Sequence, residues 1–244
     1  MPDLLTSFSV DVENFALVTH RVPAERVEPH VPEELRLQTF EDADGRYCLV
    51  SASCFCNSRF RVTGLAYPHL TFNESTYRIY VDYNGRQGVF FIGRYLGHPL
   101  AVAGQKTLHK DTWLADFDLA IERSELGYPS YDFRATGPRG ETSFSITAEE
   151  DPKKRDPFES AWDHTQFITY RISGLFLSTL GGPGHMPVSH PHMRCVEGVM
   201  HEGRFDLWEE LGILDPDETL EPYSVLVAPR VPFTLHPPRP AGRA

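Results

Sequence analysis

Hydrophobic and polar residues alternate along much of this chain, which is the pattern of half-buried β-strands. Within residues 72–96, FNESTYRIYVDYNGRQGVFFIGRYL, the alternation gives the first strand two distinct faces. One face carries Tyr77, Ile79, Val81 and Tyr83, and the other carries Glu74, Thr76, Arg78, Tyr80 and Asp82. The dipeptide Asn84-Gly85 then predicts a hairpin with a type I′ turn. Further strand-like runs occupy residues 47–55, 89–95, 113–121, 130–136, 142–148, 193–201 and 224–235.

Helical patterns are few by comparison. They cover residues 23–32, residues 98–110 with Pro99 suited to a first turn, and residues 204–213 with Gly212 as the stop. Many strands with rare helices predict a mostly β (α+β) protein with a curled or closed antiparallel sheet. Parallel βαβ units are not indicated, so a Rossmann-type cofactor crevice is not expected. Residues 149–157 read as an exposed connector and residues 237–244 as a frayed tail.

Composition narrows the function classes. The chain has 244 residues, of which 41% are hydrophobic and 12% aromatic, and this is enough to bury a large core. A net charge of −11 argues against nucleic-acid or anionic-membrane partners, because both require a basic surface. The start lacks a basic, apolar leader, and we expect a cytoplasmic protein. Four cysteines are too few and too irregular for a disulfide framework or a zinc site.

Lysine is scarce, and the spacing of two of the lysines suggests covalent catalysis by an amine. Two of the four lysines, Lys106 and Lys110, lie four residues apart in GQKTLHK. An amine can condense with a ketone, and a second cation one helical turn away would lower its pKa. The alternative is that both lysines are simply solvated on a helix face, as most lysines are.

Four segments together resemble the DUF2071 family, whose members resemble the acetoacetate decarboxylase superfamily. These segments are residues 22–54, 72–96, 100–118 and 163–176, and the resemblance extends over about residues 18–236. It implies one acetoacetate decarboxylase-like domain over residues 1–244, with a cone- or barrel-like antiparallel sheet around an internal cavity. It also implies an enzyme, a lyase, acting on a small carbonyl compound such as a keto acid.

The resemblance assigns candidate roles to individual residues. Lys110 or Lys106 would form a Schiff base with the ketone, and Glu74 corresponds in order to a carboxylate of the decarboxylase cavity. Arg78 would hold a substrate carboxylate, or else pair with Glu74 on an exposed sheet face. The decarboxylases have two adjacent lysines, whereas here Lys110 is followed by Asp111, whose charge opposes a lowered amine pKa. Aromatic residues that would line the cavity or fill the core are Tyr77, Phe91 and Trp113.

Two alternatives keep the same cavity. One is a non-covalent isomerase or cyclase in which Glu74 and a histidine act as acid and base, and the other is a small-molecule-binding protein without turnover. No cofactor is expected, and a homo-oligomer is left open. A histidine-rich segment could ligate a metal, but its spacing matches no compact motif and favours a solvated loop and strand, so no metal is expected. Its histidines are His185, His190, His192 and His201, with Glu197 nearby.

Overall fold

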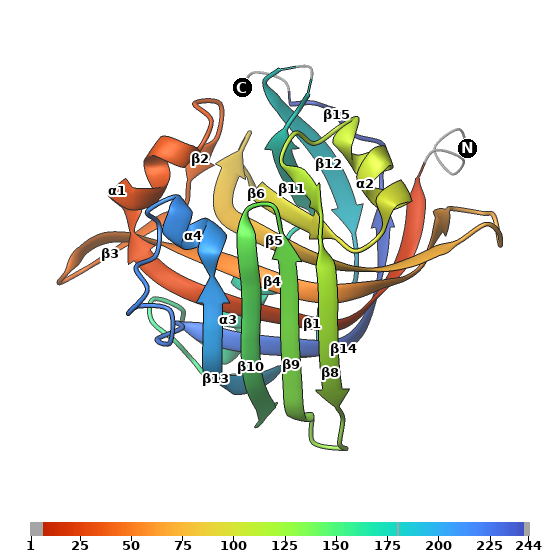
Figure 1. Cartoon of the computed structure of the whole chain (residues 1–244). Coiled ribbons are helices and arrows are strands. Elements are labelled where there is room, and N and C mark those ends of the chain that lie inside the picture. Colours follow the sequence, from red (N-terminus) through yellow and green to blue (C-terminus); the bar gives the residue numbers. More distant parts are fainter. Residues whose placement is uncertain (1–6, 180, 242–244) are drawn as a thin grey trace.

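Strands dominate the computed structural model, which describes residues 7–179 and 181–241 (Figure 1). The strands are β1 Phe8–Pro23, β2 Arg36–Leu37, β3 Thr39–Asp42, β4 Gly45–Val62, β5 Leu70–Tyr83, β6 Arg86–Leu96, β7 Thr112–Leu114, β8 Asp116–Glu122, β9 Tyr128–Gly137, β10 Gly140–Glu150, β11 Ser173–Leu177, β12 Pro183–Ser189, β13 Val196–Phe205, β14 Ser224–Leu235 and β15 Arg239–Pro240. The α-helices are α1 Ala24–Val27, α2 Pro99–Lys106, α3 Ala161–Thr169 and α4 Asp206–Glu210, and a short 3-10 turn spans Glu28–His30. None of these helices has the length and hydrophobicity of a membrane span.

A closed ring of strands forms one half of the sheet. In hydrogen-bonded order it runs β12, β11, β6, β5, β4, β1 and β14, and a short β12–β14 pairing closes it. That closure consists of two residue pairs, Val188 with Leu235 and Ser189 with Thr234. Closure removes most open strand edges and encloses an interior, as in other small barrels.

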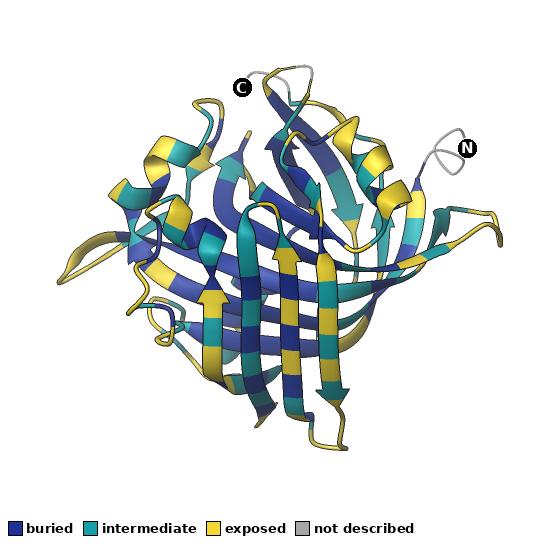
Figure 2. Ribbon diagram, in the orientation of Figure 1, coloured by how far each residue is buried: buried dark blue, intermediate teal, exposed yellow. Residues whose placement is uncertain are grey.

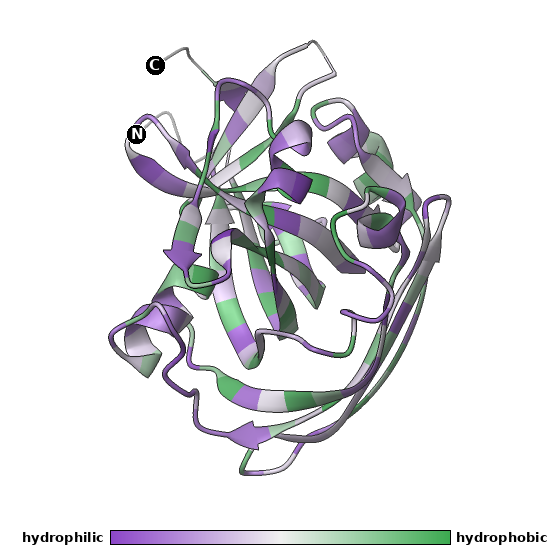
Figure 3. Ribbon diagram, turned by 90° about the vertical axis from the view of Figure 1, so that its left-hand side faces the viewer, coloured by the Kyte–Doolittle hydropathy of each residue, from purple (hydrophilic) through white to green (hydrophobic). Residues whose placement is uncertain are grey.

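The other half of the sheet continues from β14 through β13, β10, β9 and β8. Along these strands buried and exposed residues alternate, whereas β4 is buried almost continuously in its middle (Figure 2). Alternation indicates a sheet with one face on the core and one in solvent, and continuous burial indicates a strand covered on both faces. Hydrophobic and hydrophilic bands along the strands are visible in Figure 3.

Two apolar clusters therefore lie on opposite faces of the ring strands. The larger cluster joins the outer face of the ring to β9, β10, β13 and α4, and includes Tyr77, Tyr95 and Trp208. The smaller cluster fills part of the ring interior and includes Leu17, Leu49 and Tyr80.

In β1 a bulge at Asn14, whose φ is +53°, separates Val10 and Val12 from Phe15 and Leu17. The extra residue restores the side-chain alternation, so all four apolar residues belong to the interior cluster.

The predicted mostly β fold class is confirmed, and the curled sheet is compatible with a cone. The sheet is mixed and not wholly antiparallel, because β6 pairs in parallel with β7 and with β11. The two faces of β5 are as predicted, and Asn84 and Gly85 have φ of +50° and +72°, as a type I′ turn requires. Three predicted helices exist, although α2 ends at Lys106 rather than continuing to Lys110. The structure adds α3, which sequence reasoning did not anticipate.

The chain end differs from the predicted frayed tail. Within residues 237–244, Arg239–Pro240 pairs with β12, and residues 242–244 lie outside the described part. Residues 151–160 form the link between β10 and α3, where the exposed connector was expected.

Candidate functional site

A cavity of about 90 Å³ lies inside the strand ring. Since one water molecule needs roughly 10–15 Å³ of such space, it has room for a molecule of several non-hydrogen atoms. Every strand of the ring contributes to its wall. Apolar side chains make up much of that wall, and the polar ones are Asn57, Glu74, Thr76, Arg78, Arg94, Thr169, Arg171 and His190. An apolar hollow with a few converging polar groups is the usual form of a small-molecule site.

Glu74 and Arg94 form a buried ion pair in the cavity wall. The carboxylate Oε1 of Glu74 accepts hydrogen bonds from Nε of Arg94 at 3.0 Å and from its Nη2, while Oε2 accepts one from Nδ2 of Asn57 at 2.8 Å. Nη1 of Arg94 also donates to Gln105 at 3.3 Å. The Glu74 carboxylate is therefore fixed in one orientation, and the charge of Arg94 is matched.

The charges of Arg78 and Arg171 are not matched by a carboxylate in this way. Both are buried, at 7% and 5% exposure, and Nε and Nη2 of each find no hydrogen-bond acceptor among the described residues. Nη1 of Arg171 donates to Gln87 at 3.0 Å, and its guanidinium carbon lies 4.1 Å from the ring centroid of Phe167. Aromatic faces stabilise a cation without neutralising it.

Burial is the main cause of the lowered pKa of both arginines. The pKa of Arg171 falls to about 10, first by desolvation and further by repulsion from Arg78. Desolvation likewise lowers the pKa of Arg78. The pKa of His190 is lowered by burial too, with Arg78 contributing. At neutral pH the arginines remain charged, so the wall carries three positive charges against the one carboxylate of Glu74.

Such an excess of buried positive charge is unfavourable unless an anion enters. Two guanidinium groups with free N–H donors suit a carboxylate, which each can bind through two parallel hydrogen bonds. The cavity is thus built to accept a small organic anion.

Neither lysine reaches this cavity. Lys106 and Lys110 are both exposed, and neither contributes to the wall. Because α2 ends at Lys106, the two lysines do not share a helix face. The chain beyond it is held to β11, where the backbone N–H of Lys110 donates to the carbonyl of Leu177 at 2.9 Å and His109 bridges to Ser178.

The remaining candidates divide between the two faces of the ring. Glu74, Arg78 and Phe91 line the cavity. Tyr77 lies on the opposite face, where its ring packs against Trp208 with centroids 4.9 Å apart. Trp113 also packs against that outer cluster. Tyr77 and Trp113 therefore contribute to the core and not to the cavity wall.

Arg94, Arg171 and Asn57 are cavity residues that sequence reasoning missed. Arg94 lies on β6 opposite Thr76 of β5, so it shares the Glu74 face. It lies within the predicted hairpin, but the register shift in that hairpin hides which face it occupies. Arg171 lies between α3 and β11, more than 70 residues along the chain from Arg94, and carries no local signal.

The histidines of the C-terminal segment separate into different environments. His190 lines the cavity, His192 stacks on Tyr170, and His201 bonds Thr147 at 2.9 Å. Nδ1 of His185 faces Arg239. No group of three or more potential ligands among the described residues is arranged to hold a metal ion.

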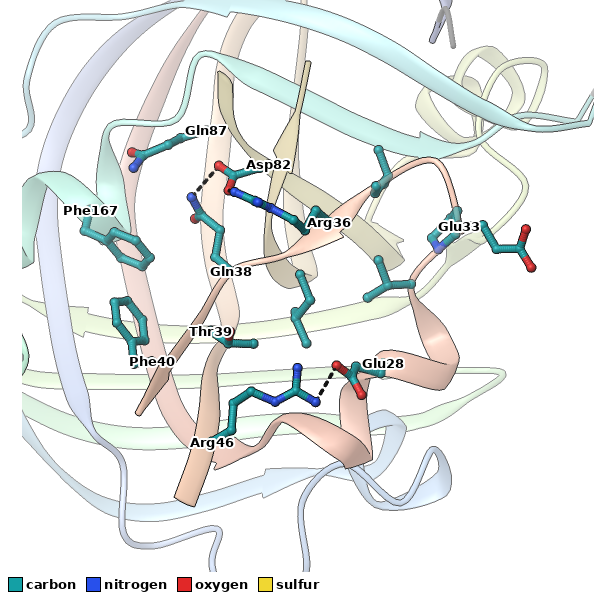
Figure 4. A pocket seen from close by; sticks show the side chains of 14 residues that line it. Glu28, Glu33, Arg36, Gln38, Thr39, Phe40, Arg46, Asp82, Gln87 and Phe167 are labelled. Carbon is teal, nitrogen blue, oxygen red and sulfur yellow. Dashed lines mark hydrogen bonds and ion pairs between the residues drawn. The ribbon is translucent and has the colours of Figure 1, made fainter. Parts of the chain in front are cut away.

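A larger groove of about 740 Å³ lies nearby (Figure 4). Both of its arginines are paired: Arg46 with Glu28 at 2.8 Å, and Arg36 with Asp82 at 3.0 Å. Since its arginines already have carboxylate partners, this groove makes no comparable demand for an anionic ligand. Arg171 of the cavity contacts Gln87 and Phe167, which belong to the groove wall.

Comparison with known proteins identifies the family. The model of DUF2071, described as an uncharacterized conserved protein, matches residues 10–232, so the chain belongs to this family. No curated protein matches the chain.

Several solved structures share the fold. The enduracididine biosynthesis enzyme MppR complexed with pyruvate has a TM-score of 0.64 and 12% identity, over 97% of this chain and 90% of MppR. Acetoacetate decarboxylase from Legionella pneumophila has a TM-score of 0.61 and 13% identity, over 97% of this chain and 86% of that one. An acetoacetate decarboxylase-like enzyme from Sphingomonas wittichii has a TM-score of 0.57 and 13% identity, over 98% and 93%. At such identities the likeness establishes an acetoacetate decarboxylase-like fold.

Proposed function

We propose that this DUF2071 member is an enzyme that binds a small keto acid in the ring cavity and acts on it without a covalent lysine intermediate. The observation that carries the proposal is the pair of buried guanidinium groups, Arg78 and Arg171, whose Nε and Nη2 atoms lack acceptors. A carboxylate would supply those acceptors and offset the excess charge. The fold it shares with MppR, a protein solved with pyruvate, supports a keto acid as the class of ligand.

Glu74 is the base in this proposal. Its carboxylate, oriented by Arg94 and Asn57, removes a proton from the carbon next to the ketone. The C–H electron pair forms the C=C bond of the enolate, and the π pair of the carbonyl moves onto its oxygen. The resulting enolate oxygen accepts hydrogen bonds from a cavity guanidinium, which stabilises the charge as it develops. Return of the proton to a different atom of the enolate completes an isomerisation.

The Schiff-base route is not part of the proposal, because it requires an uncharged amine inside the cavity. Both Lys106 and Lys110 are exposed outside it. Borohydride reduction in the presence of pyruvate or acetoacetate should leave the intact mass of the protein unchanged. Lys106→Arg and Lys110→Arg should bind and turn over keto acids as the parent chain does. A stable adduct on either lysine would contradict the proposal.

A binding protein without turnover is the second candidate. It is favoured by the fact that both oxygens of Glu74 already accept hydrogen bonds from Arg94 and Asn57, which limits its availability as a base. Solvent deuterium exchange at the carbon next to the ketone distinguishes the candidates. Exchange that Glu74→Gln abolishes supports the enzyme, and binding with no exchange supports the binding protein.

Calorimetric titration with pyruvate, acetoacetate and α-ketobutyrate tests the anion site itself. Arg78→Met and Arg171→Met should each weaken binding by at least about 30-fold, because losing one partner of a buried charged contact costs about 2 kcal/mol or more. Arg36→Met, which alters a paired arginine of the large groove, is the matched control and should bind as the parent does. Failure of every acid to bind the parent chain would refute the proposal.

A further inference from the structure

A second, apolar hollow adjoins the cavity. It has a volume of about 190 Å³, and Met186 and Leu235 belong to the walls of both spaces. Its other wall residues come from β1, β4, β5, α2 with the turn that follows it, and the segment after β14. We call this space the side pocket.

The side pocket lies where the strand ring closes. Leu235 pairs with Val188 in the short β12–β14 contact and with Phe8 of β1. Met186 lies two residues before Val188. Only Leu235 and the long, flexible thioether of Met186 are common to the two walls, and methionine readily changes its packing to fit a neighbour.

The side pocket differs from the cavity in chemistry. Phe60 packs between Phe8, at 5.1 Å between ring centroids, and Phe72, at 5.7 Å. The amide of Gln105 is one of the few polar groups in its wall, and that amide accepts a hydrogen bond from Arg94 of the cavity. One end of the combined space therefore favours an anion and the other favours hydrocarbon.

Exposed apolar side chains gather at its rim. Phe8, Leu100 and Leu108 are 37%, 66% and 39% exposed, although they come from β1 and the region of α2, far apart in sequence. A cluster of exposed large apolar residues around a hollow is unfavourable in water and commonly marks a binding site.

We propose that the substrate is a keto acid with an apolar chain, whose carboxylate binds at Arg78 and Arg171 and whose chain extends past Met186 and Leu235 into the side pocket. This inference rests on the proposed function, since it requires the carboxylate site. It adds the substrate class: medium-chain aliphatic keto acids bind better than pyruvate.

The test is a calorimetric series of straight-chain α-keto acids: pyruvate, α-ketobutyrate, α-ketohexanoate and α-ketooctanoate. Each methylene that enters the side pocket should increase affinity by about fourfold, from the free energy of burying one CH₂. The gain should stop when the pocket is full.

Gly104 offers a way to fill the side pocket without touching the cavity. It lies on α2, and a Cβ atom added there would meet no heavy atom within 4 Å beyond its chain neighbours and its own helix backbone. Gly104→Phe should therefore fold, and should place its ring in or over the hollow. It should abolish the gain with chain length while leaving pyruvate affinity unchanged. Gly104→Ala is the matched control, and should keep the full gain.

The outcomes separate this inference from the proposed function. If pyruvate and the longer acids all fail to bind, the carboxylate site itself is refuted. If all bind with equal affinity, or if Gly104→Phe keeps the gain, the side pocket inference is overturned and the carboxylate site stands.

Discussion

The side chains on the two faces of β5 have opposite surroundings. Tyr77, Ile79 and Val81 point into the larger apolar cluster, where each is almost fully buried by other side chains. Glu74, Thr76 and Arg78 point into the ring, where they border a hollow. One face is explained by packing alone. The other face places charges in a low-dielectric interior, which packing does not explain.

This difference distinguishes residues that stabilise the fold from residues that would bind a ligand. A buried apolar side chain contributes stability in the absence of any partner. A buried, unmatched guanidinium lowers stability until an anion arrives. The face of β5 that reduces stability is therefore the face that we associate with function.

Removing Tyr77 should produce the largest loss of stability. Tyr77→Ala deletes a fully buried ring that packs on Trp208, and should lower the free energy of unfolding by about 3–5 kcal/mol. Urea denaturation followed by tryptophan fluorescence measures it. Tyr77→Phe keeps the ring and loses only the contact of the hydroxyl with Thr142, so it should cost about 1 kcal/mol. Equal losses for both variants would show that packing does not dominate this face.

Arg94→Met should be the most destabilising change on the cavity face. It leaves the buried carboxylate of Glu74 with Asn57 as its remaining partner, and should cost about 3 kcal/mol in urea denaturation. Adding Glu74→Gln to the same variant should restore much of that loss, because the carboxylate that lost its arginine partner is then gone. A double variant as unstable as Arg94→Met alone would mean that Arg94 acts through packing.

The sequence predicts the two faces of β5 because its alternation is unbroken. It does not reveal β1, the ring strand between β4 and β14, because the bulge at Asn14 shifts the phase between Val12 and Phe15. Read with a strict period of two, the apolar residues of this segment fall on both faces. A bulge is stabilised by neighbouring strands, and the linear pattern cannot show them.

The linear pattern also fails to show which face of the hairpin Arg94 occupies. Counting outward from the Asn84-Gly85 turn pairs Arg78 with Phe91, and would then pair Ser75 with Arg94, on the Tyr77 face. In the structure the pairing register of β5 and β6 shifts between Arg78 and Tyr77. Arg94 therefore lies opposite Thr76, and its side chain reaches Glu74. Arg171 joins them only because β11 pairs with β6 and the ring closes, and these contacts are non-local.

The lysine hypothesis failed to place an amine in the cavity for a local reason. Residues four apart share a face only while the helix continues, and α2 stops at Lys106. Beyond it His109 turns inward and stacks on Phe176, so Lys110 is directed away from the interior. That Glu74 and Arg78 share one face, in contrast, follows from the alternation in β5 alone.

Buried histidines should make the protein sensitive to mild acid. Burial, and secondarily the charge of Arg94, lowers the pKa of His109 to about 3, and burial, with Arg155 contributing, lowers that of His164 to about 4. Both values lie below the unfolded value of 6.5, so the unfolded chain binds more protons and stability falls as pH falls through 6.5.

Between pH 6.5 and about pH 5 each of the two histidines should remove about 2 kcal/mol of unfolding free energy. Urea denaturation at several pH values measures the slope. His109→Phe, which preserves the stacking with Phe176, should make that slope shallower by the share of one histidine. An unchanged slope would show that His109 takes up a proton in the folded protein.

Arg78→Met should have the smallest effect on the stability of the empty protein, and this is the sharpest contrast with its neighbour Tyr77. Methionine has a similar length and brings no charge into the cavity, so the free energy of unfolding should change by less than about 1 kcal/mol or should increase. In the presence of a saturating keto acid, the parent chain should gain stability through binding and Arg78→Met should not. Thermal unfolding with and without the acid measures both effects. If Arg78→Met instead destabilises the empty protein as much as Tyr77→Ala, Arg78 has a structural role and the two faces of β5 do not differ in kind.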